Sequence, residues 1–390
     1  MRSLELFTGA GGLALGIKKG GFMHAGSVEF NHDACETLRF NRSLPGSELS
    51  GWNIYEGDTR TIADFGLAYP NIQVVAGGPP CQPFSIGGKA KGQSDKRDMF
   101  PEAVRAVRQT KPSGFIFENV KGLLRDAFSD YFEYVILQLT YPEEVKKQNE
   151  QADSHRNRLE KIHTRGGYTG LKYHVVWQLL NAADYGIPQK RERVFIVGFR
   201  SDMGAEWSFP SPTHSKFALD YSKFVSGSYF EEHKISRKFI REIQPTSSEK
   251  DSILRRYEKT GPLARWQTTR DAISDLPCPI KYSDPSFNHV FVPGARPYPG
   301  HTGSHIDEPA KTLKAGDHGV PGGENMLLNY DGSVRYFTLR EAARLQTFPD
   351  SYRFQGAWSE GMRQLGNAVP VDLGKVVAKS VYKTLKISKR

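Results

Sequence analysis

A cysteine stands at the end of a stiff turn, in a setting typical of a nucleophile. Cys81 follows the residues Gly-Gly-Pro-Pro, which come shortly after the apolar run 72–75. The glycines permit backbone angles that other residues resist, and the prolines fix φ. We therefore expect a rigid loop at the carboxyl end of a strand, where open α/β sheets bind their ligands. An ordinary buried cysteine has no use for such a platform, so we interpret Cys81 as a nucleophile.

An acid and two arginines accompany two further apolar runs. Glu118 ends the run 114–117, and burial there predicts a raised pKa, so that the carboxyl could hold a proton near neutral pH. Residues 189–193 read Gln-Lys-Arg-Glu-Arg, and in a strand Arg191 and Arg193 share one face. Two such arginines suit an anion or a base carbonyl. A turn-capping acid and a row of surface ion pairs are the structural alternatives.

A glycine-rich turn near the start indicates a nucleotide-like cofactor. The short apolar run 4–7 leads into Thr-Gly-Ala-Gly-Gly, and Gly9, Gly11 and Ala14 fit the turn that joins a first strand to a first helix in dinucleotide-binding folds. Glu29 ends the next apolar strand about 20 residues later, where an acid binds ribose hydroxyls. Asp58 could accept from an adenine amino group or be a solvated turn residue. Nicotinamide and adenosyl cofactors both fit these features.

The composition restricts the class of partner, the use of metals and the location that we expect for the protein. The chain has 390 residues, a net charge of +10 and a pI near 9.3, which suits a polyanionic partner. Cys35, Cys81 and Cys278 match neither a disulfide framework nor a zinc spacing, so we expect no metal and a reducing interior. The sequence has neither a signal peptide nor an apolar run of membrane-spanning length, which predicts a cytoplasmic protein.

The pattern along the chain predicts an α/β fold with a second, smaller, irregular domain. Apolar strands dominate up to residue 199, interrupted by a charged stretch, 141–165, that we expect to be a solvated insertion, either helical or irregular, without a role in the chemistry. From about 200 to 330 periodicity is weak and turn residues are common, with basic and aromatic groups at 238–241, 255–257 and 265–266 that could read nucleic acid. A capping box at Thr338 predicts a helix over 339–346, and Pro370 precedes an apolar helix over 371–385.

Taken together, the motifs resemble those of the DNA (cytosine-5) methyltransferases, in order and over nearly the whole chain. The resemblance implies a Rossmann-like catalytic and cofactor-binding domain, residues 1–199 plus 355–390, and a target-recognition domain, residues 200–354. Six segments carry it: Phe-Thr-Gly-Ala-Gly-Gly at 7–12, Gly-Pro-Pro-Cys-Gln at 78–82, Glu-Asn-Val at 118–120, Gln-Lys-Arg-Glu-Arg at 189–193, Leu-Arg-Glu-Ala-Ala-Arg at 339–344 and Gly-Asn-Ala-Val-Pro at 366–370.

The resemblance implies S-adenosylmethionine as the cofactor and assigns residues to it. By similarity, Glu29 binds the ribose hydroxyls and Phe30 packs on the adenine, with Asp58 and Thr59 at the edge of that ring. The remaining cofactor residues are Phe7, Gly9, Ala10, Gly12, Pro79, Asn367 and Ala368. Many members of the family carry a serine in place of Ala368, so one hydroxyl contact is absent.

The same resemblance implies methylation of cytosine C5 in duplex DNA. Cys81 would add to C6 of a flipped-out cytosine, with Glu118 at N3 and an arginine, preferably Arg193 rather than Arg191, at O2. Contacts with DNA fall to residues of the segment after Cys81 and to a Thr-Leu pair, namely Ser85, Lys89, Lys91, Thr312 and Leu313. The Gly- and Lys-rich stretch 86–96 would close over the flipped base as a lid, or else be a linker.

Three rival functions remain to be weighed. A nicotinamide-dependent oxidoreductase would explain the glycine-rich turn but not Cys81 and the two arginines. A cytosine-5 methyltransferase acting on RNA would use the same ring chemistry, although the long 200–330 region favours duplex DNA. A non-enzymatic DNA-binding protein is disfavoured, because every residue type that the chemistry needs is present. We expect a bacterial monomer that protects DNA beside a restriction endonuclease with the same target, without stable contact; a solitary methyltransferase is the alternative.

Overall fold

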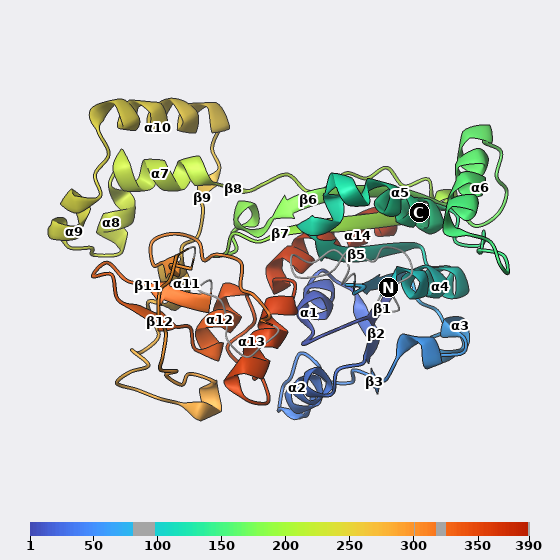
Figure 1. Cartoon of the computed structure of the whole chain (residues 1–390), viewed down its shortest axis with the longest axis horizontal. Coiled ribbons are helices and arrows are strands. Elements are labelled where there is room, and N and C mark those ends of the chain that lie inside the picture. The colour runs from blue at the N-terminus through green and yellow to red at the C-terminus, as the bar shows by residue number, and fades with distance from the viewer. Residues whose placement is uncertain (81–97, 300, 317–324, 389–390) are drawn as a thin grey trace. The chain divides into compact units, whose positions relative to one another are not determined.

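The chain folds into two compact units, each of them built from separate stretches of sequence. The first unit is Met1–Leu180, Glu192–Pro210 and Gly374–Arg390, and the second is Asn181–Arg191 and Ser211–Leu373. The structure is a computed structural model that describes residues 1–80, 98–299, 301–316 and 325–388 (Figure 1). The boundaries predicted from the sequence were 199/200 and 354/355, and the functional roles of the two parts stay predictions.

A seven-stranded sheet is the centre of the first unit, with the strand order β3-β2-β1-β4-β5-β7-β6. Strands β1 to β5 run parallel, and β7 lies antiparallel to β5. The strands β4 and β5 are mainly apolar and β1 is buried from Ser3 onward, as expected for strands that are covered on both faces. Their bounds are β1 Arg2–Leu6, β2 Met23–Glu29, β3 Ile54–Glu56, β4 Val74–Gly77, β5 Gly114–Val120, β6 Tyr173–Asn181 and β7 Glu192–Arg200.

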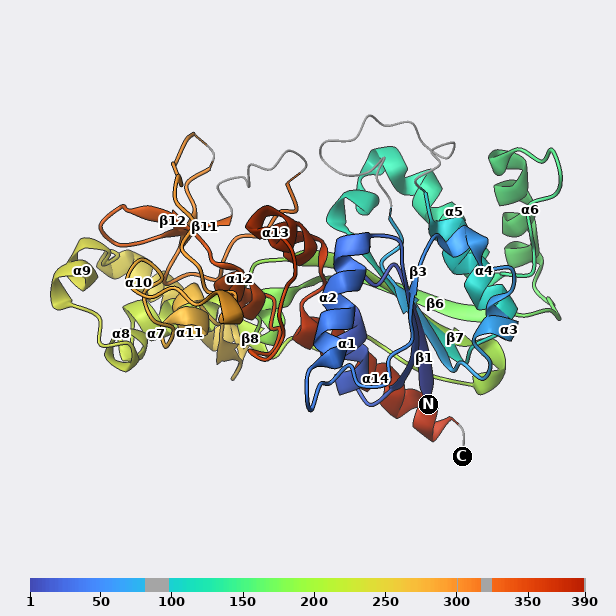
Figure 2. The ribbon, with the colours of Figure 1, turned by 90° about the horizontal axis from the view of Figure 1, so that it is seen from below.

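Helices cover both faces of this sheet (Figure 2). On one face, the main core joins the strands to α4 and α5 through buried residues such as Phe100, Val107 and Phe132. On the other face, α14 packs against α1, where Gly20 lies so close to Ala378 that a Cβ on it would meet the alanine Cβ at 2.6 Å. The bounds are α1 Gly12–Lys19, α2 His32–Ser43, α3 Phe65–Ala68, α4 Phe100–Thr110, α5 Ser129–Thr140, α6 Ala152–Arg165 and α14 Val371–Ile387.

The charged stretch 141–165 forms a largely solvated helix, one of the two forms expected for it, but it also contributes to a small core that was not expected. It contains α6, which buries Leu159 against Tyr134 and Tyr141 in a small separate core. His155 of α6 is 1% exposed and bonds both the Tyr134 hydroxyl and the Glu144 carbonyl. The sequence pattern did not predict this core, because the helix has one narrow apolar stripe and most of its side chains are polar or charged and lie in water.

The second unit combines small sheets with short helices. Strands β10, β11 and β12 form one sheet, and β8 pairs with β9. Helix α7 packs on β9 and on α10, where Tyr221 and Tyr257 stack at 4.1 Å. The bounds are β8 His214–Ser215, α7 Lys216–Phe224, α8 Ser228–Glu232, α9 Arg237–Glu242, α10 Ser247–Thr260, β9 Ala264–Arg265, α11 Thr269–Ile273, β10 Ser304–His305, β11 Met326–Leu328, β12 Val334–Tyr336, α12 Leu339–Leu345 and α13 Trp358–Asn367.

Two predicted helix starts are confirmed at the level of hydrogen bonds and bounds. Thr338 accepts from the Glu341 amide and Glu341 accepts from the Thr338 amide, so the capping box opens α12 as expected. The apolar helix after Pro370 begins at Val371, also as expected. None of the described helices combines the length and the apolar character that crossing a lipid bilayer requires.

Candidate active site

The candidate site of the first unit lies where four strands end side by side. Leu6 of β1 pairs with Val28 of β2 and with Gly77 of β4, and Gly77 pairs with Phe117 of β5. The residues that follow these four are therefore neighbours at one end of the sheet: Phe7, Glu29, Gly78 and Glu118. This register places the glycine-rich turn, the predicted ribose acid, the cysteine loop and the predicted proton donor at one edge.

The glycine-rich turn bends sharply out of β1. Phe7, Gly9 and Gly11 have φ values of 56°, 54° and 82°, and the Gly11 amide donates to the Thr8 carbonyl at 3.0 Å. A positive φ is rare for an aromatic residue, so Phe7 is held in a strained conformation. Gly9 has no heavy atom within 4 Å of the place where a Cβ would stand, which leaves room on that side of the turn.

The Glu29 carboxylate is fixed beside this turn. One oxygen accepts from the Gly9 amide at 2.6 Å, and the other accepts from the Asn31 amide at 2.7 Å. The next residue, Phe30, is 76% exposed although it is a large apolar side chain at a strand end. A rigid carboxylate beside an open aromatic ring fits a ribose and a flat base.

Asp58 and Thr59 follow β3 with different surroundings. The guanidinium and the amide of Arg60 bond the Asp58 carboxylate, and these bonds lower its pKa. An adenine amino group would have to share Asp58 with Arg60. Thr59 is 3% exposed, and its hydroxyl has no hydrogen-bond partner among the described residues.

Glu118 and Arg193 form a buried ion pair. The Arg193 Nε lies 2.7 Å from the Glu118 Oε1, and the two side chains are 11% and 9% exposed. Burial lowers the pKa of Arg193, and the neighbouring Glu118 acts in the opposite direction. A Cβ on Gly78 would stand 3.2 Å from the Glu118 Oε2, so the chain leading to Cys81 passes close to this carboxylate.

Asn119 positions the start of the cysteine loop, a role that the sequence analysis did not assign. Its side-chain amide donates to the Pro79 carbonyl at 2.9 Å, and Pro79 precedes Cys81 by two residues. The Pro80 carbonyl accepts from the Met99 amide at 3.2 Å. A polar residue directly after the candidate acid Glu118, at the end of an apolar strand, was the available signal. Cys81, Ser85, Lys89 and Lys91 lie outside the described residues.

Arg191 differs from its expected place on a strand face shared with Arg193. The strand β7 begins at Glu192, so Arg191 precedes it and belongs to the second unit. The Arg191 side chain is fully buried and donates to the carbonyls of Leu313, Gly366 and Ala368 at 3.1, 2.7 and 2.8 Å. The two arginines therefore serve different partners, and a carbonyl-bound guanidinium is a structural anchor in this setting.

The remaining predicted residues of the second unit are placed as follows. The Thr312 hydroxyl donates to the Lys190 carbonyl at 2.7 Å, and Leu313 is 1% exposed, so both side chains face the protein. Asn367 is exposed at the end of α13, and Ala368 is 8% exposed. Trp266 is 8% exposed, and Arg265 bonds Asp271 and Glu232, which removes this pair from the predicted nucleic-acid readers.

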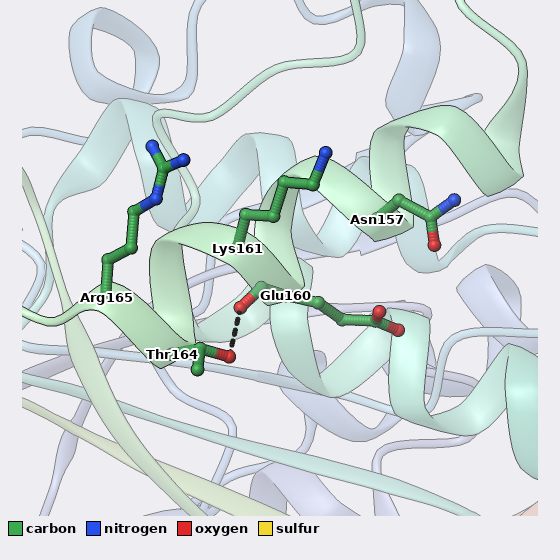
Figure 3. Close-up of a pocket in the computed structure, with 5 residues that line it drawn as sticks. All are labelled: Asn157, Glu160, Lys161, Thr164 and Arg165. Atoms are coloured by element: carbon green, nitrogen blue, oxygen red, sulfur yellow. Dashed lines mark hydrogen bonds between the residues drawn. The ribbon is translucent and has the colours of Figure 1, made fainter.

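Three other polar groupings carry no chemistry that we can assign. His32, Glu36 and Glu56 could hold a metal ion, as could Glu232, His233 and Asp271. Both groups already engage an arginine, Arg39 in the first and Arg265 in the second. A surface hollow on α6 is lined by one helix alone, through Asn157, Glu160, Lys161, Thr164 and Arg165 (Figure 3).

Comparison with known proteins identifies the family. The model of the C-5 cytosine-specific DNA methylases matches residues 1–141 and 148–383. The chain belongs to this family. Within the charged stretch 141–165, the family match leaves only residues 142–147 unmatched.

Curated relatives of the methylase family align over almost the full chain. The type II methyltransferase M.NgoMIV of Neisseria gonorrhoeae is 30% identical over 388 residues, which are 98% of each chain. M.Eco47II of Escherichia coli, also a type II methyltransferase, is 34% identical over 395 residues, covering 99% of this chain and 80% of the relative. This similarity confirms the resemblance drawn from the six motifs.

Solved structures of more distant methyltransferases share the fold. A candidate DNA modification methyltransferase encoded within an E. coli prophage has a TM-score of 0.58 at 20% identity, with 99% of both chains covered. The Dnmt2 methyltransferase of S. pombe has a TM-score of 0.56 at 18% identity over the same share of both chains. The expected α/β fold class with its large, mostly parallel sheet is thereby confirmed.

Proposed function

We propose that this methylase-family protein transfers a methyl group from S-adenosylmethionine to C5 of a cytosine in duplex DNA. The observation that carries the proposal is the buried Glu118–Arg193 pair at the strand edge, beside the backbone that leads to Cys81. A carboxyl group that carries a proton can donate to a ring nitrogen, and a guanidinium beside it can donate to a ring carbonyl. Membership of the family supplies the reaction class.

The residues at the glycine-rich turn fit an adenosyl cofactor. The Glu29 carboxylate is oriented by two backbone amides, the Phe30 ring is open, and the Thr59 hydroxyl is buried with no hydrogen-bond partner in the described part of the chain. These groups would bind the ribose hydroxyls, the face of the adenine and its edge. When bound, S-adenosylmethionine supplies an electrophilic methyl group. The assignment of Asn367 and Ala368 to the same cofactor rests on the family motif.

The chemistry of the cytosine ring falls to three side chains. C5 of cytosine is a weak nucleophile, and addition of the Cys81 thiolate to C6 turns C5 into an electron-rich, enamine-like carbon. As the thiolate adds, Glu118 in its protonated form would give its proton to N3, and Arg193 would donate hydrogen bonds to O2, which offsets the negative charge that the addition places on the ring. After methylation, the C5 proton passes to solvent, the Cys81 thiolate leaves C6 and N3 returns its proton to Glu118, which restores the aromatic ring.

Access to C6 requires the cytosine to leave the base stack, at a cost of a few kcal/mol. Contacts between the DNA phosphates and basic side chains offset this cost, and the chain carries a net charge of +10. We assign such contacts to Ser85, Lys89 and Lys91, and sequence reading to the second unit. Because the curated relatives are type II methyltransferases, we propose that the protein protects DNA against a restriction endonuclease with the same target. We propose a monomer as the default oligomeric state.

The test is transfer of a labelled methyl group from S-adenosylmethionine to unmethylated duplex DNA, followed by nucleoside analysis. We expect 5-methylcytosine with the wild type and none with Cys81→Ala. Cys35→Ala is the control, because the Cys35 thiol is buried and the Glu29 carbonyl is the one partner that it bonds among the described residues. Methylation of tRNA but not of DNA would replace the DNA substrate by RNA, and 5-methylcytosine formed by Cys81→Ala would overturn the role of that thiol.

A further inference from the structure

Arg191 joins two segments that lie far apart in the sequence. Its guanidinium donates to the carbonyl of Leu313 and to the carbonyls of Gly366 and Ala368, and no part of the side chain is exposed. The fork of an arginine can satisfy several carbonyls at once, whereas a lysine presents a single point charge. The residue type is therefore matched to a task of holding two backbones together.

Further bonds fix the first of these segments, residues 312–315. The Leu313 amide donates to the Gln189 Oε1 at 3.1 Å, and Gln189 is itself fully buried. The Asn325 side chain accepts from the Lys314 amide at 3.0 Å and donates to the Lys314 carbonyl at 2.9 Å. The Thr312 hydroxyl donates to the Lys190 carbonyl. Three successive residues, 312–314, are therefore fixed by hydrogen bonds to other parts of the protein.

The second segment, residues 366–368, lies directly against the first. A Cβ on Gly366 would stand 2.3 Å from the Ala315 amide nitrogen, so only a glycine permits this approach. The Gln346 side-chain amide donates to the Leu365 carbonyl at 2.6 Å, which holds the end of α13 from the other side. The two segments thus share one contact surface, with Arg191 bonded to both.

A direct catalytic role for Arg191 does not fit this arrangement. A guanidinium that binds a cytosine carbonyl needs N–H groups that reach the substrate, whereas the Arg191 side chain is fully buried and donates three hydrogen bonds to protein carbonyls. Arg193, which contacts Glu118, fits that role instead. The chain offers a close structural parallel in Arg340, which is also fully buried and donates to the carbonyls of Phe287, Pro349 and Tyr352.

We propose that Arg191 is a positioning residue that makes segments 312–315 and 366–368 one rigid body. Under the proposed function, on which this consequence rests, the first segment belongs to the DNA reader and the second to the cofactor site. A cofactor that reduces the motion of segment 366–368 would then also reduce the motion of segment 312–315, because the two segments move together. Binding at one site would thereby lower the cost of ordering the other.

Hydrogen exchange of the unliganded protein tests whether Arg191 makes segments 312–315 and 366–368 one rigid body. The reporters are the amides of Leu313 and Lys314 in one segment and of Ala368 in the other, all hydrogen-bonded. We expect Arg191→Lys to raise the exchange rates of both segments together, by about tenfold or more, because hydrogen bonds to a charged group are lost. Arg340→Lys, the matched control, should leave both segments unchanged. A rise in one segment only, or an equal rise in the control, would overturn the proposal.

Gly366→Ala puts the same question if Arg191→Lys does not fold. The added methyl group would press on the Ala315 backbone without removing any charge. We expect faster exchange in both segments here as well, and a change confined to 366–368 would count against a single rigid body.

S-adenosylhomocysteine then tests the coupling. In the wild type it should slow exchange in both segments, and in Arg191→Lys it should slow exchange in 366–368 alone. Protection of 312–315 by the ligand in both proteins would overturn the coupling through Arg191. A wild type that gains no protection anywhere would contradict the proposed cofactor instead, and the unliganded comparison would still decide the role of Arg191.

Discussion

At the residue scale, the Glu118 carboxylate can be tested apart from its neighbours. We expect Glu118→Gln to lower kcat by about a hundredfold or more, because an amide cannot give a proton to N3 as the thiolate adds. The dissociation constant of S-adenosylhomocysteine should stay within a few-fold of the wild-type value. Glu192→Gln is the control, since that carboxylate is 46% exposed and bonds Lys121. An active Glu118→Gln enzyme would remove Glu118 from the chemistry.

A second glutamate of the same sheet predicts a dependence of stability on pH. Glu5 of β1 is 2% exposed, and burial raises its pKa well above the ordinary value, with the Ala14 amide opposing and the Glu29 charge adding to the rise. The folded protein therefore keeps a proton that the unfolded chain releases above about pH 4.3. Its contribution is fully present below that pH and falls by up to about 1.4 kcal/mol per pH unit until the folded pKa is passed.

Urea unfolding of the wild type and of Glu5→Gln over pH 5 to 8 measures this effect. The stability of Glu5→Gln relative to the wild type should rise with pH, because the substituted side chain has no proton to lose. A constant difference over that range would show that Glu5 keeps an ordinary pKa. Glu192→Gln, which changes an exposed carboxylate, separates this effect from the loss of any acidic group.

The sequence predicted the residue types of the site better than it predicted their partners. Cys81, Glu118 and Glu29 could be singled out because each follows a short apolar run, and the ends of such runs meet at one edge of a parallel sheet. The partners of Arg191 are 122, 175 and 177 residues away in the chain. The alternation of side chains along a strand predicted the face on which Arg191 would lie. It could not reveal that Arg191 bonds three carbonyls that are distant in the sequence.

At the scale of elements, α6 offers a clear test of packing. Leu159→Ala should lower the free energy of unfolding by about 2–4 kcal/mol, because Leu159 is fully buried and its truncation leaves a cavity. Lys161→Ala, on the exposed part of the same helix, should change stability by less than about 0.5 kcal/mol. Methyl-transfer activity below the unfolding transition should be unaltered in both variants. Equal stability of the two would mean that α6 is not anchored.

Helix ends were predictable where a local rule decides them. The Thr338 capping box and the start of α14 after Pro370 depend on residues within one turn of each other. The burial of α6 depends instead on Tyr134 and Tyr141, which lie outside the helix. Short-range patterns carry no information of that kind.

At the scale of the whole molecule, the two units predict a separable specificity. Replacing residues 216–330 by the aligned residues of M.Eco47II should change the DNA sequence that becomes methylated and leave the product as 5-methylcytosine. Replacing α6 by its aligned segment should leave the target sequence unchanged. Bisulfite sequencing of methylated DNA measures both. If the chimera with residues 216–330 replaced is active and still methylates the original target, these residues do not determine the target sequence.

The division of the chain also has a consequence for how the protein is made. The polypeptide passes between the two units at 180/181, 191/192, 210/211 and 373/374, so neither unit is one continuous stretch. Helix α14, which packs on α1 through Gly20 and Ala378 and on Trp207 through Ser380, follows the second unit in the chain. During synthesis on the ribosome, α14 can therefore pack on the apolar face of α1 only after the second unit has been synthesised. Until then the first unit is complete except for α14, and its exposed apolar surface is a site for chaperone binding or aggregation.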